Sequence, residues 1–99
     1  SKVIDLIREL KSWQLDVQVV DPWADPDEVW RKYEIKLVKK DALEGLSAVI
    51  VAVGHYQFRA MTIEDFRSIC PLKGAVFGDL KSLYKKEALY NAGFNVFRL

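Results

Sequence analysis

Cysteine is almost absent from this chain: Cys70 is the only one among 99 residues, so no intramolecular disulfide can form. A protein without disulfides fits a reducing compartment, and we therefore expect a cytoplasmic location. No apolar run approaches the roughly 20 residues of a membrane-spanning helix, so we expect no membrane association. The first residues have an amphipathic helical pattern that includes acidic side chains, unlike a secretory signal.

The sequence also lacks an excess of charge of one sign. Lys and Arg number 15 and Asp and Glu number 14, which gives a formal net charge of +1. Proteins that bind nucleic acids usually carry a basic surface, so we expect no nucleic-acid partner. Hydrophobic residues make up 51% of the chain, which indicates a globular core and not a disordered segment.

Several motifs that carry chemistry are missing. The chain has neither of the glycine-rich loops that bind phosphates, no cysteine and histidine cluster with metal-ligand spacing, and no G-x-S-x-G elbow. Cys70 stands at the predicted end of a helix, where the helix dipole disfavours a thiolate. We therefore interpret Cys70 as buried and unreactive.

Strand and helix patterns instead alternate along the whole chain. This alternation predicts an α/β domain over residues 1–99, with a mainly parallel sheet, right-handed crossovers and helices on both faces. Ser1, Asp25 and Thr62 are the expected helix N-caps, and Gly93 is expected to end the last helix. The predicted helices cover residues 2–13, 24–33, 41–46, 62–70 and 82–93, and the predicted strands cover 17–21, 35–38, 48–53, 74–80 and 94–99.

The strand at 48–53 ends in Gly54 and the only histidine, His55. Ligands of open α/β sheets collect at this end of a strand. A catalytic base needs an orienting partner, and no acidic residue is near His55 in the sequence. We therefore expect His55 to line a cleft without transferring protons. Arg59 has no acidic residue near it in the sequence, and two interpretations stay open: an anion contact or a solvated side chain. Phe58 and Met61 are expected to be core residues beneath this loop.

Asp79 and Lys81 follow the buried strand at 74–80, directly before a helix that Ser82 would cap. A lysine at this position is well placed to meet a phosphate or carboxylate at the sheet edge. Asp21 has the spacing of a ribose-binding acid, but no glycine-rich turn accompanies it. The turn of Asp21 and the following proline explains that residue better.

The ordered motifs "VVDPWADP", "AVIVAVGHYQFR", "GAVFGDLKSLY" and "AGFNVFRL" resemble the C-terminal domain of the UDP-glucose/GDP-mannose dehydrogenase family. The resemblance covers essentially the whole chain and looks closest to the branch that oxidises UDP-N-acetylhexosamines. It implies a three-layer, Rossmann-like domain that binds the UDP-sugar substrate of an NAD-dependent 6-dehydrogenase. It also implies a UDP-hexuronic acid product, used for surface polysaccharides.

The same resemblance implies how the complete enzyme divides its work. NAD is bound mainly by an N-terminal domain, a central segment mediates assembly into a homo-oligomer, and the catalytic cysteine lies upstream. Cys70 and His55 match no catalytic position, so the chain alone is expected to be inactive. The family's D-x-R/K element matches Asp79 and Lys81, which implies that Lys81 contacts the nucleotide-sugar, with Asp79 as its local partner. A lysine offers a single charge where arginine offers a two-pronged fork.

A further family element, a strand and loop ending in D-x-R-x-S, would place its serine at Ser1. We therefore expect residues 17–21 to pair directly with 48–53, or a partner chain to lie between them. Two functions from other classes remain alternatives: a stand-alone flavodoxin-like signalling domain, such as a receiver, and an oligomerisation module. A receiver needs a phospho-accepting aspartate after a central strand, where this chain has Gly54 and His55.

Overall fold

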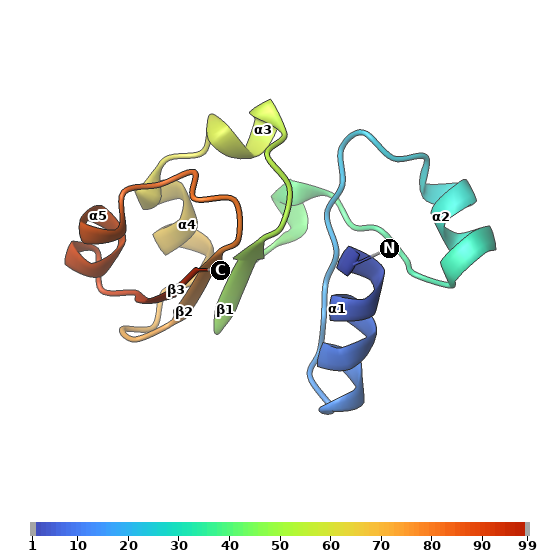
Figure 1. The fold of residues 1–99 in the computed structure, drawn as a ribbon, viewed down its shortest axis with the longest axis horizontal. Helices are drawn as coiled ribbons and strands as arrows, with labels where there is room; N and C mark the ends of the chain where they lie inside the picture. The colour runs from blue at the N-terminus through green and yellow to red at the C-terminus, as the bar shows by residue number, and fades with distance from the viewer. Residues whose placement is uncertain (1, 99) are drawn as a thin grey trace. The chain divides into compact units, whose positions relative to one another are not determined.

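The computed structural model describes residues 2–98 and divides the chain into two compact units, residues 1–43 and 44–99 (Figure 1). The first unit contains the helices α1 (Lys2–Ser12) and α2 (Pro26–Tyr33) and the 3₁₀ turn η1 (Lys40–Ala42). The second contains three strands and three helices.

Local signals explain the helices of the first unit. α2 begins as predicted: the carboxylate of Asp25 accepts a hydrogen bond of 3.0 Å from the N–H of Asp27, and Pro26 takes the first helical position. The amphipathic pattern of α1 buries Ile7. The predicted N-cap of α1, Ser1, lies outside the described residues.

The two strands predicted in this unit are wrong. Residues 17–21 and 35–38 form only an isolated parallel bridge between Val19 and Leu37, where the N–H of Val38 donates to Val19 O at 2.9 Å. Of the two arrangements expected for residues 17–21, direct pairing with 48–53 does not form within residues 2–98, and a partner chain between the segments stays a prediction. A strand is stabilised by ladders on its sides, and a β-branched run alone does not supply them.

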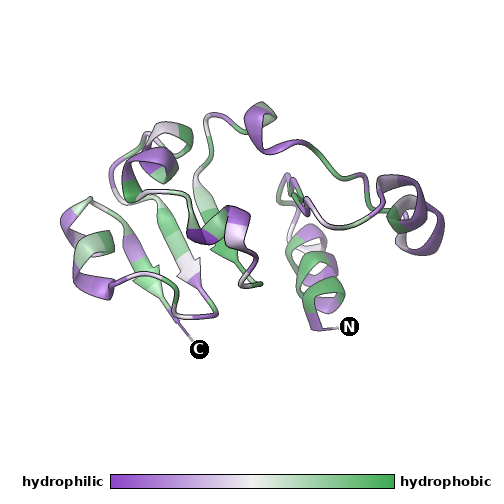
Figure 2. Cartoon of the chain, turned by 90° about the horizontal axis from the view of Figure 1, so that it is seen from above, coloured by the Kyte–Doolittle hydropathy of each residue, from purple (hydrophilic) through white to green (hydrophobic). Residues whose placement is uncertain are grey.

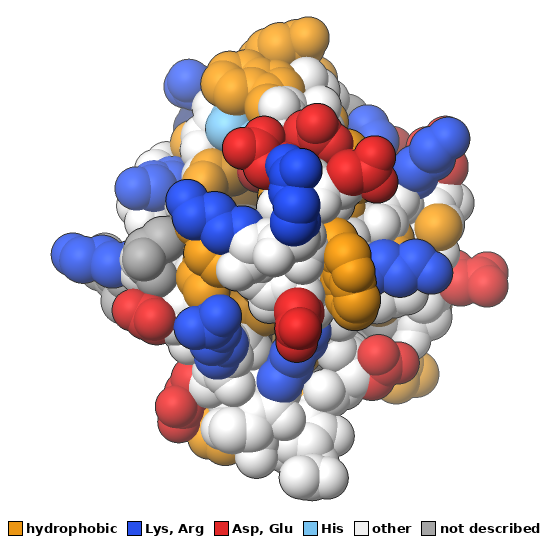
Figure 3. Space-filling model, turned by 90° about the vertical axis from the view of Figure 1, so that its right-hand side faces the viewer, with side chains coloured by type: hydrophobic (Ala, Val, Ile, Leu, Met, Phe, Trp, Pro, Cys, Tyr) orange, Lys and Arg blue, Asp and Glu red, His pale blue; other side chains and the backbone are white. Residues whose placement is uncertain are grey.

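Most large apolar side chains of the first unit reach solvent. Its buried hydrophobic residues are Ile7 and Ile35, whereas Trp13, Trp23 and Trp30 are 56–62% exposed. The face in Figure 3 shows hydrophobic side chains between interspersed charges of both signs.

The second unit contains a parallel sheet with the strand order β1 (Ala48–Val51), β2 (Val76–Asp79) and β3 (Asn95–Phe97). Each strand falls inside a predicted one, and the parallel direction is as predicted. The hydropathy colouring of Figure 2 shows apolar segments along these strands. The sheet is smaller than the sequence pattern suggests, because residues 17–21 and 35–38 do not join it.

Helices α4 (Ile63–Ile69) and α5 (Lys86–Asn91) complete the core of this unit. Phe77 of β2 is fully buried and meets Phe66 of α4 edge to face, with ring centroids 4.9 Å apart. Cys70 is also fully buried, as predicted, and Phe58 and Met61 pack against the same core. On the opposite face of the sheet, Phe97 is 41% exposed.

Helix capping was predicted correctly for α4 and incorrectly for α5. Thr62 and Asp65 form the predicted capping box, with bonds of 3.1 and 2.9 Å. Ser82 caps no helix: α5 begins only at Lys86, and Ser82 has a positive φ of 53°. The chain instead loops around Asp79, as described below. Gly93 follows α5 with a φ of 97°, as a helix-ending glycine does.

Among residues 2–98, no helix is both long and apolar enough to cross a membrane.

Candidate functional site

The predicted site residues lie at one edge of the second unit's sheet. Parallel strands end at the same edge, so the segments after β1 and after β2 both start there. The first segment contains His55, the one-turn helix α3 (Tyr56–Arg59) and Met61, and the second is the loop of residues 80–85. Figure 1 shows α3 following the end of β1.

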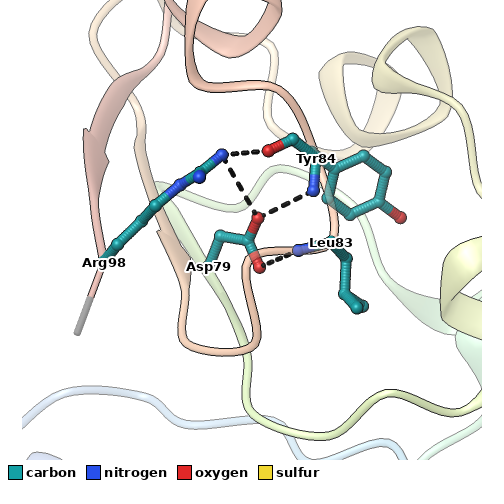
Figure 4. Close-up of polar contacts among 4 residues, drawn as sticks. All are labelled: Asp79, Leu83, Tyr84 and Arg98. Carbon is teal, nitrogen blue, oxygen red and sulfur yellow. Dashed lines mark hydrogen bonds and ion pairs between the residues drawn. The ribbon is translucent and has the colours of Figure 1, made fainter.

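Asp79 is the fully buried centre of this edge. Its Oδ1 accepts the N–H of Leu83 at 3.0 Å, and its Oδ2 accepts the N–H of Tyr84 at 2.9 Å (Figure 4). Arg98, one residue beyond β3, lies 3.8 Å from the same Oδ2. The carboxylate therefore holds the loop around itself, in the way an N-cap holds the start of a helix. This explains why α5 does not begin at Ser82.

Lys81 is exposed in the loop that Asp79 organises. We expected Asp79 to be its local partner, but within residues 2–98 no hydrogen bond or ion pair joins the two side chains. The buried aspartate therefore shapes the loop, and the lysine is left to face solvent or a ligand. Asp79 and Lys81 therefore have different roles in the structure, which the D-x-K pattern alone does not distinguish.

His55 and Arg59 lie in the segment after β1. His55 is the N-cap residue of α3, and its half-buried ring stacks on Phe58 with centroids 5.8 Å apart. Arg59 is exposed in the last turn of α3. The short helix was not predicted, because a single turn has too few residues for a periodic pattern.

Tyr84 is the residue of this edge that the sequence did not reveal. Its hydroxyl donates to the carbonyl oxygens of Phe58 and, at 3.2 Å, Met61, while its own carbonyl accepts from Arg98. Burial, followed by the charges of Asp79 and Asp65, raises the pKa of Tyr84 to about 12. The phenol therefore remains a proton donor at neutral pH. No local motif marks these contacts, since their acceptors are backbone atoms more than twenty residues away.

The described residues offer no alternative centre for covalent or metal chemistry. Burial raises the pKa of the Cys70 thiol, and the neighbouring Arg67 only partly opposes this effect, so the thiol stays protonated. Residues 2–98 contain no group of three side chains that could hold a metal ion. What remains at the sheet edge is a set of exposed cations, Lys81 and Lys85 in the second segment and Arg59 in the first, together with the half-buried imidazole of His55. Such an arrangement suits the binding of an anion.

Comparisons with known proteins point to the same chemistry. The family described as "UDP-glucose/GDP-mannose dehydrogenase family, UDP binding domain" matches residues 1–86. The chain is 38% identical over 87 residues to a UDP-N-acetyl-D-glucosamine 6-dehydrogenase of Salmonella typhi, and 30% identical over 87 residues to one of Pseudomonas aeruginosa. Both alignments cover 88% of this chain but only 20% of the relative, so the chain spans about a fifth of their length.

Proposed function

Because this chain belongs to the UDP-glucose/GDP-mannose dehydrogenase family, we propose that it is the part of a UDP-sugar 6-dehydrogenase that binds the UDP moiety of the substrate. Lys81 contacts the diphosphate, and Arg59 and His55 line the rim of the same site. The reaction itself takes place on residues outside this chain. The domain's contribution is to orient the nucleotide and to exclude water from it.

One observation carries this proposal: Lys81 is presented, exposed and unpaired within residues 2–98, by a loop that a buried aspartate holds in place. A cation on an ordered loop loses little conformational entropy when it meets a phosphate. The position also fits, because nucleotides bind beyond the carboxyl ends of parallel strands. Lysine provides a point charge here and not a two-pronged contact.

The chain does not have the residues needed for an NAD site of its own. A dinucleotide's diphosphate needs a glycine-rich turn between a strand and a helix of several turns. The segment after β1 has only Gly54 before the four-residue α3, and the loop after β2 contains Leu80, Lys81 and Ser82. NAD is therefore assigned to the rest of the enzyme, and the chain alone is expected to be inactive.

The substrate we propose is UDP-N-acetylglucosamine, with the corresponding uronic acid as product, because both relatives bear the name of that dehydrogenase. We assign the contacts that select the sugar to the rest of the enzyme. We further propose that the complete enzyme is a cytoplasmic homo-oligomer whose other domains close over this one.

We also propose that the complete protein has the larger sheet of the three-layer fold that the family resemblance implies. The carbonyls of Ser47 and Val51 accept hydrogen bonds from β2 residues and their neighbours, so the backbone groups of Ala48 and Ile50 face the other edge of β1. Within the described residues that edge has no strand beside it. We propose that another strand of the complete protein pairs there, and that the half-exposed face carrying Phe97 becomes covered.

The test is a titration of the 99-residue chain with UDP, followed by amide NMR shifts and calorimetry. We expect shifts at residues 80–85 and 55–61, and a loss of affinity of tenfold or more for Lys81→Ala, since a charge-assisted hydrogen bond is worth about 1.5–3 kcal/mol. Lys73→Ala is the matched control: it removes an exposed lysine before β2, at the opposite end of the strand.

The same pair of variants in the full-length dehydrogenase gives the decisive measurement. Lys81→Ala should raise KM for the UDP-sugar with kcat little changed, and Lys73→Ala should change neither value. Equal KM values for the two variants would refute the assignment of Lys81. A signalling or oligomerisation module, the alternative from the sequence, predicts no UDP-dependent shift at all.

A further inference from the structure

One side chain connects the two segments that form the proposed site. The Tyr84 hydroxyl donates to the carbonyls of Phe58 and Met61, in the segment after β1. The same residue's N–H is held by Asp79, and its carbonyl accepts from Arg98 (Figure 4). Tyr84 thus has hydrogen-bonded partners at the ends of β2 and β3 and in the segment that follows β1.

The tyrosine ring is itself held in a fixed position. It lies edge to face against Phe66 of α4, with centroids 5.5 Å apart, and against Phe77 of β2, at 5.7 Å. Figure 4 shows the ring of Tyr84 pointing away from Arg98. The phenol and the backbone of Tyr84 therefore contact partners on opposite sides of the residue. A hydroxyl on a ring packed in this way has little freedom to follow a moving loop.

Lys81 and Arg59 depend on different parts of this arrangement. Lys81 belongs to the loop that Asp79 holds, whereas Arg59 belongs to α3 and directly follows Phe58, whose carbonyl accepts from the phenol. Within residues 2–98, no hydrogen bond or ion pair joins the side chain of Lys81 to that of Arg59. The tyrosine hydroxyl is a direct hydrogen-bonded connection between the two segments.

We propose that Tyr84 is a positioning residue: its hydroxyl fixes the segment of His55 and Arg59 relative to the loop of Lys81, and thereby preorganises both walls of the nucleotide site. This inference rests on the proposed function for its ligand, but the connection between the segments is independent of it. Tyr84 contacts no ligand in this proposal. It acts by restricting the motion of the two segments in the free protein, so that ligand binding costs less conformational entropy.

The variant that tests this is Tyr84→Phe, which keeps the packed ring and both backbone contacts and removes only the hydroxyl. The carbonyls of Phe58 and Met61 then lose their donor. We expect faster amide hydrogen exchange at residues 55–61, unchanged exchange at Leu83, and UDP affinity about fivefold lower, the ordinary effect of one lost hydrogen bond. Tyr90→Phe, at an exposed tyrosine of α5, is the matched control and should behave as wild type.

A second variant keeps the test decisive if Tyr84→Phe does not fold. Arg98→Lys retains the positive charge beside Asp79 but offers a smaller set of donors to it and to the Tyr84 carbonyl. We expect about a threefold loss of UDP affinity and faster exchange at Tyr84. In the full-length enzyme, either variant should raise KM for the UDP-sugar and leave kcat unchanged.

The outcomes separate the two proposals. Faster exchange at 55–61 with unchanged UDP affinity would overturn the positioning role and leave the proposed function intact. Unchanged exchange in Tyr84→Phe would overturn the connection itself. If the wild-type full-length enzyme shows no interaction between UDP and residues 80–85, the proposed function fails, while faster exchange in Tyr84→Phe would still support the connection.

Discussion

The two units of this chain have similar helices but very different cores. Residues 44–99 enclose a cluster of fully or nearly fully buried side chains that includes Phe77, Leu89 and Phe94. Residues 1–43 bury only Ile7 and Ile35 among their hydrophobic residues, and leave three tryptophans exposed. The second unit has a three-stranded ladder, and the first has one isolated bridge. The local sequence signals for a helix therefore suffice to form helices in both units. A larger hydrophobic core forms only in the unit whose strands pair into a sheet.

Core substitutions should reveal this contrast most strongly. Phe77→Ala removes a ring that meets Phe66 and Phe94 edge to face, and we expect it to destabilise the second unit by about 3–5 kcal/mol. Trp30→Ala, at a 56% exposed tryptophan of α2, should cost the first unit less than about 1 kcal/mol. Urea titrations followed by amide signals of each unit measure both values. Equal losses would mean that Trp30 is buried in solution.

Two aspartates provide the next comparison: Asp79 ends β2, and Asp21 lies in a turn of the first unit. Asp79→Ala leaves the N–H groups of Leu83 and Tyr84 and the charge of Arg98 without their acceptor, at a cost of about 3 kcal/mol. Asp21→Ala removes an exposed turn bond of 3.0 Å to the N–H of Trp23, worth about 0.5–1 kcal/mol. Thermal unfolding of both variants tests the difference. A mild effect at Asp79 would show that water replaces its contacts.

These contrasts indicate what the sequence could and could not predict. Proline, capping residues and β-branched runs act over a few residues, and they located α2, α4 and the three strands of the second unit. Strand pairing depends on distant partners. Residues 17–21 have the composition of a strand, but composition specifies no neighbour, and the structure gives them one bridge.

The site shows the same division. A strand-ending aspartate followed by a lysine is compatible with a ligand-binding carboxylate and with a buried one that binds its own loop. Only the path of residues 80–85 shows that Asp79 is buried. Tyr84 was missed for a related reason, because its partners are carbonyl oxygens, which every residue type carries.

The pH dependence of stability should also distinguish the second unit from the first, because Tyr84 titrates there with a raised pKa. Its folded-state pKa is raised from 10.0 to about 12, so the phenol's contribution to stability is complete below pH 10 and is lost as the pH rises towards 12. Allowing for solvent screening, we expect a loss of about 1–2 kcal/mol. Urea unfolding near pH 9 and pH 11 measures it. Tyr84→Phe should lose less stability over this interval, because it lacks the phenol; identical losses would contradict the assignment of the pH dependence to Tyr84.

Matched N-cap substitutions give the smallest difference between the units. Thr62→Ala removes a bond of 3.1 Å at α4, which packs Phe66 into the core, so about 1 kcal/mol should be lost by the whole second unit. Asp25→Ala removes a bond of 3.0 Å at α2, which has no buried residue. Loss of this N-cap bond should therefore destabilise only α2. Amide exchange distinguishes the cases: faster exchange across β1, β2 and β3 for Thr62→Ala, and faster exchange confined to residues 26–33 for Asp25→Ala. If Asp25→Ala accelerated exchange throughout its unit, the first unit would have a cooperative core that its exposed tryptophans do not indicate.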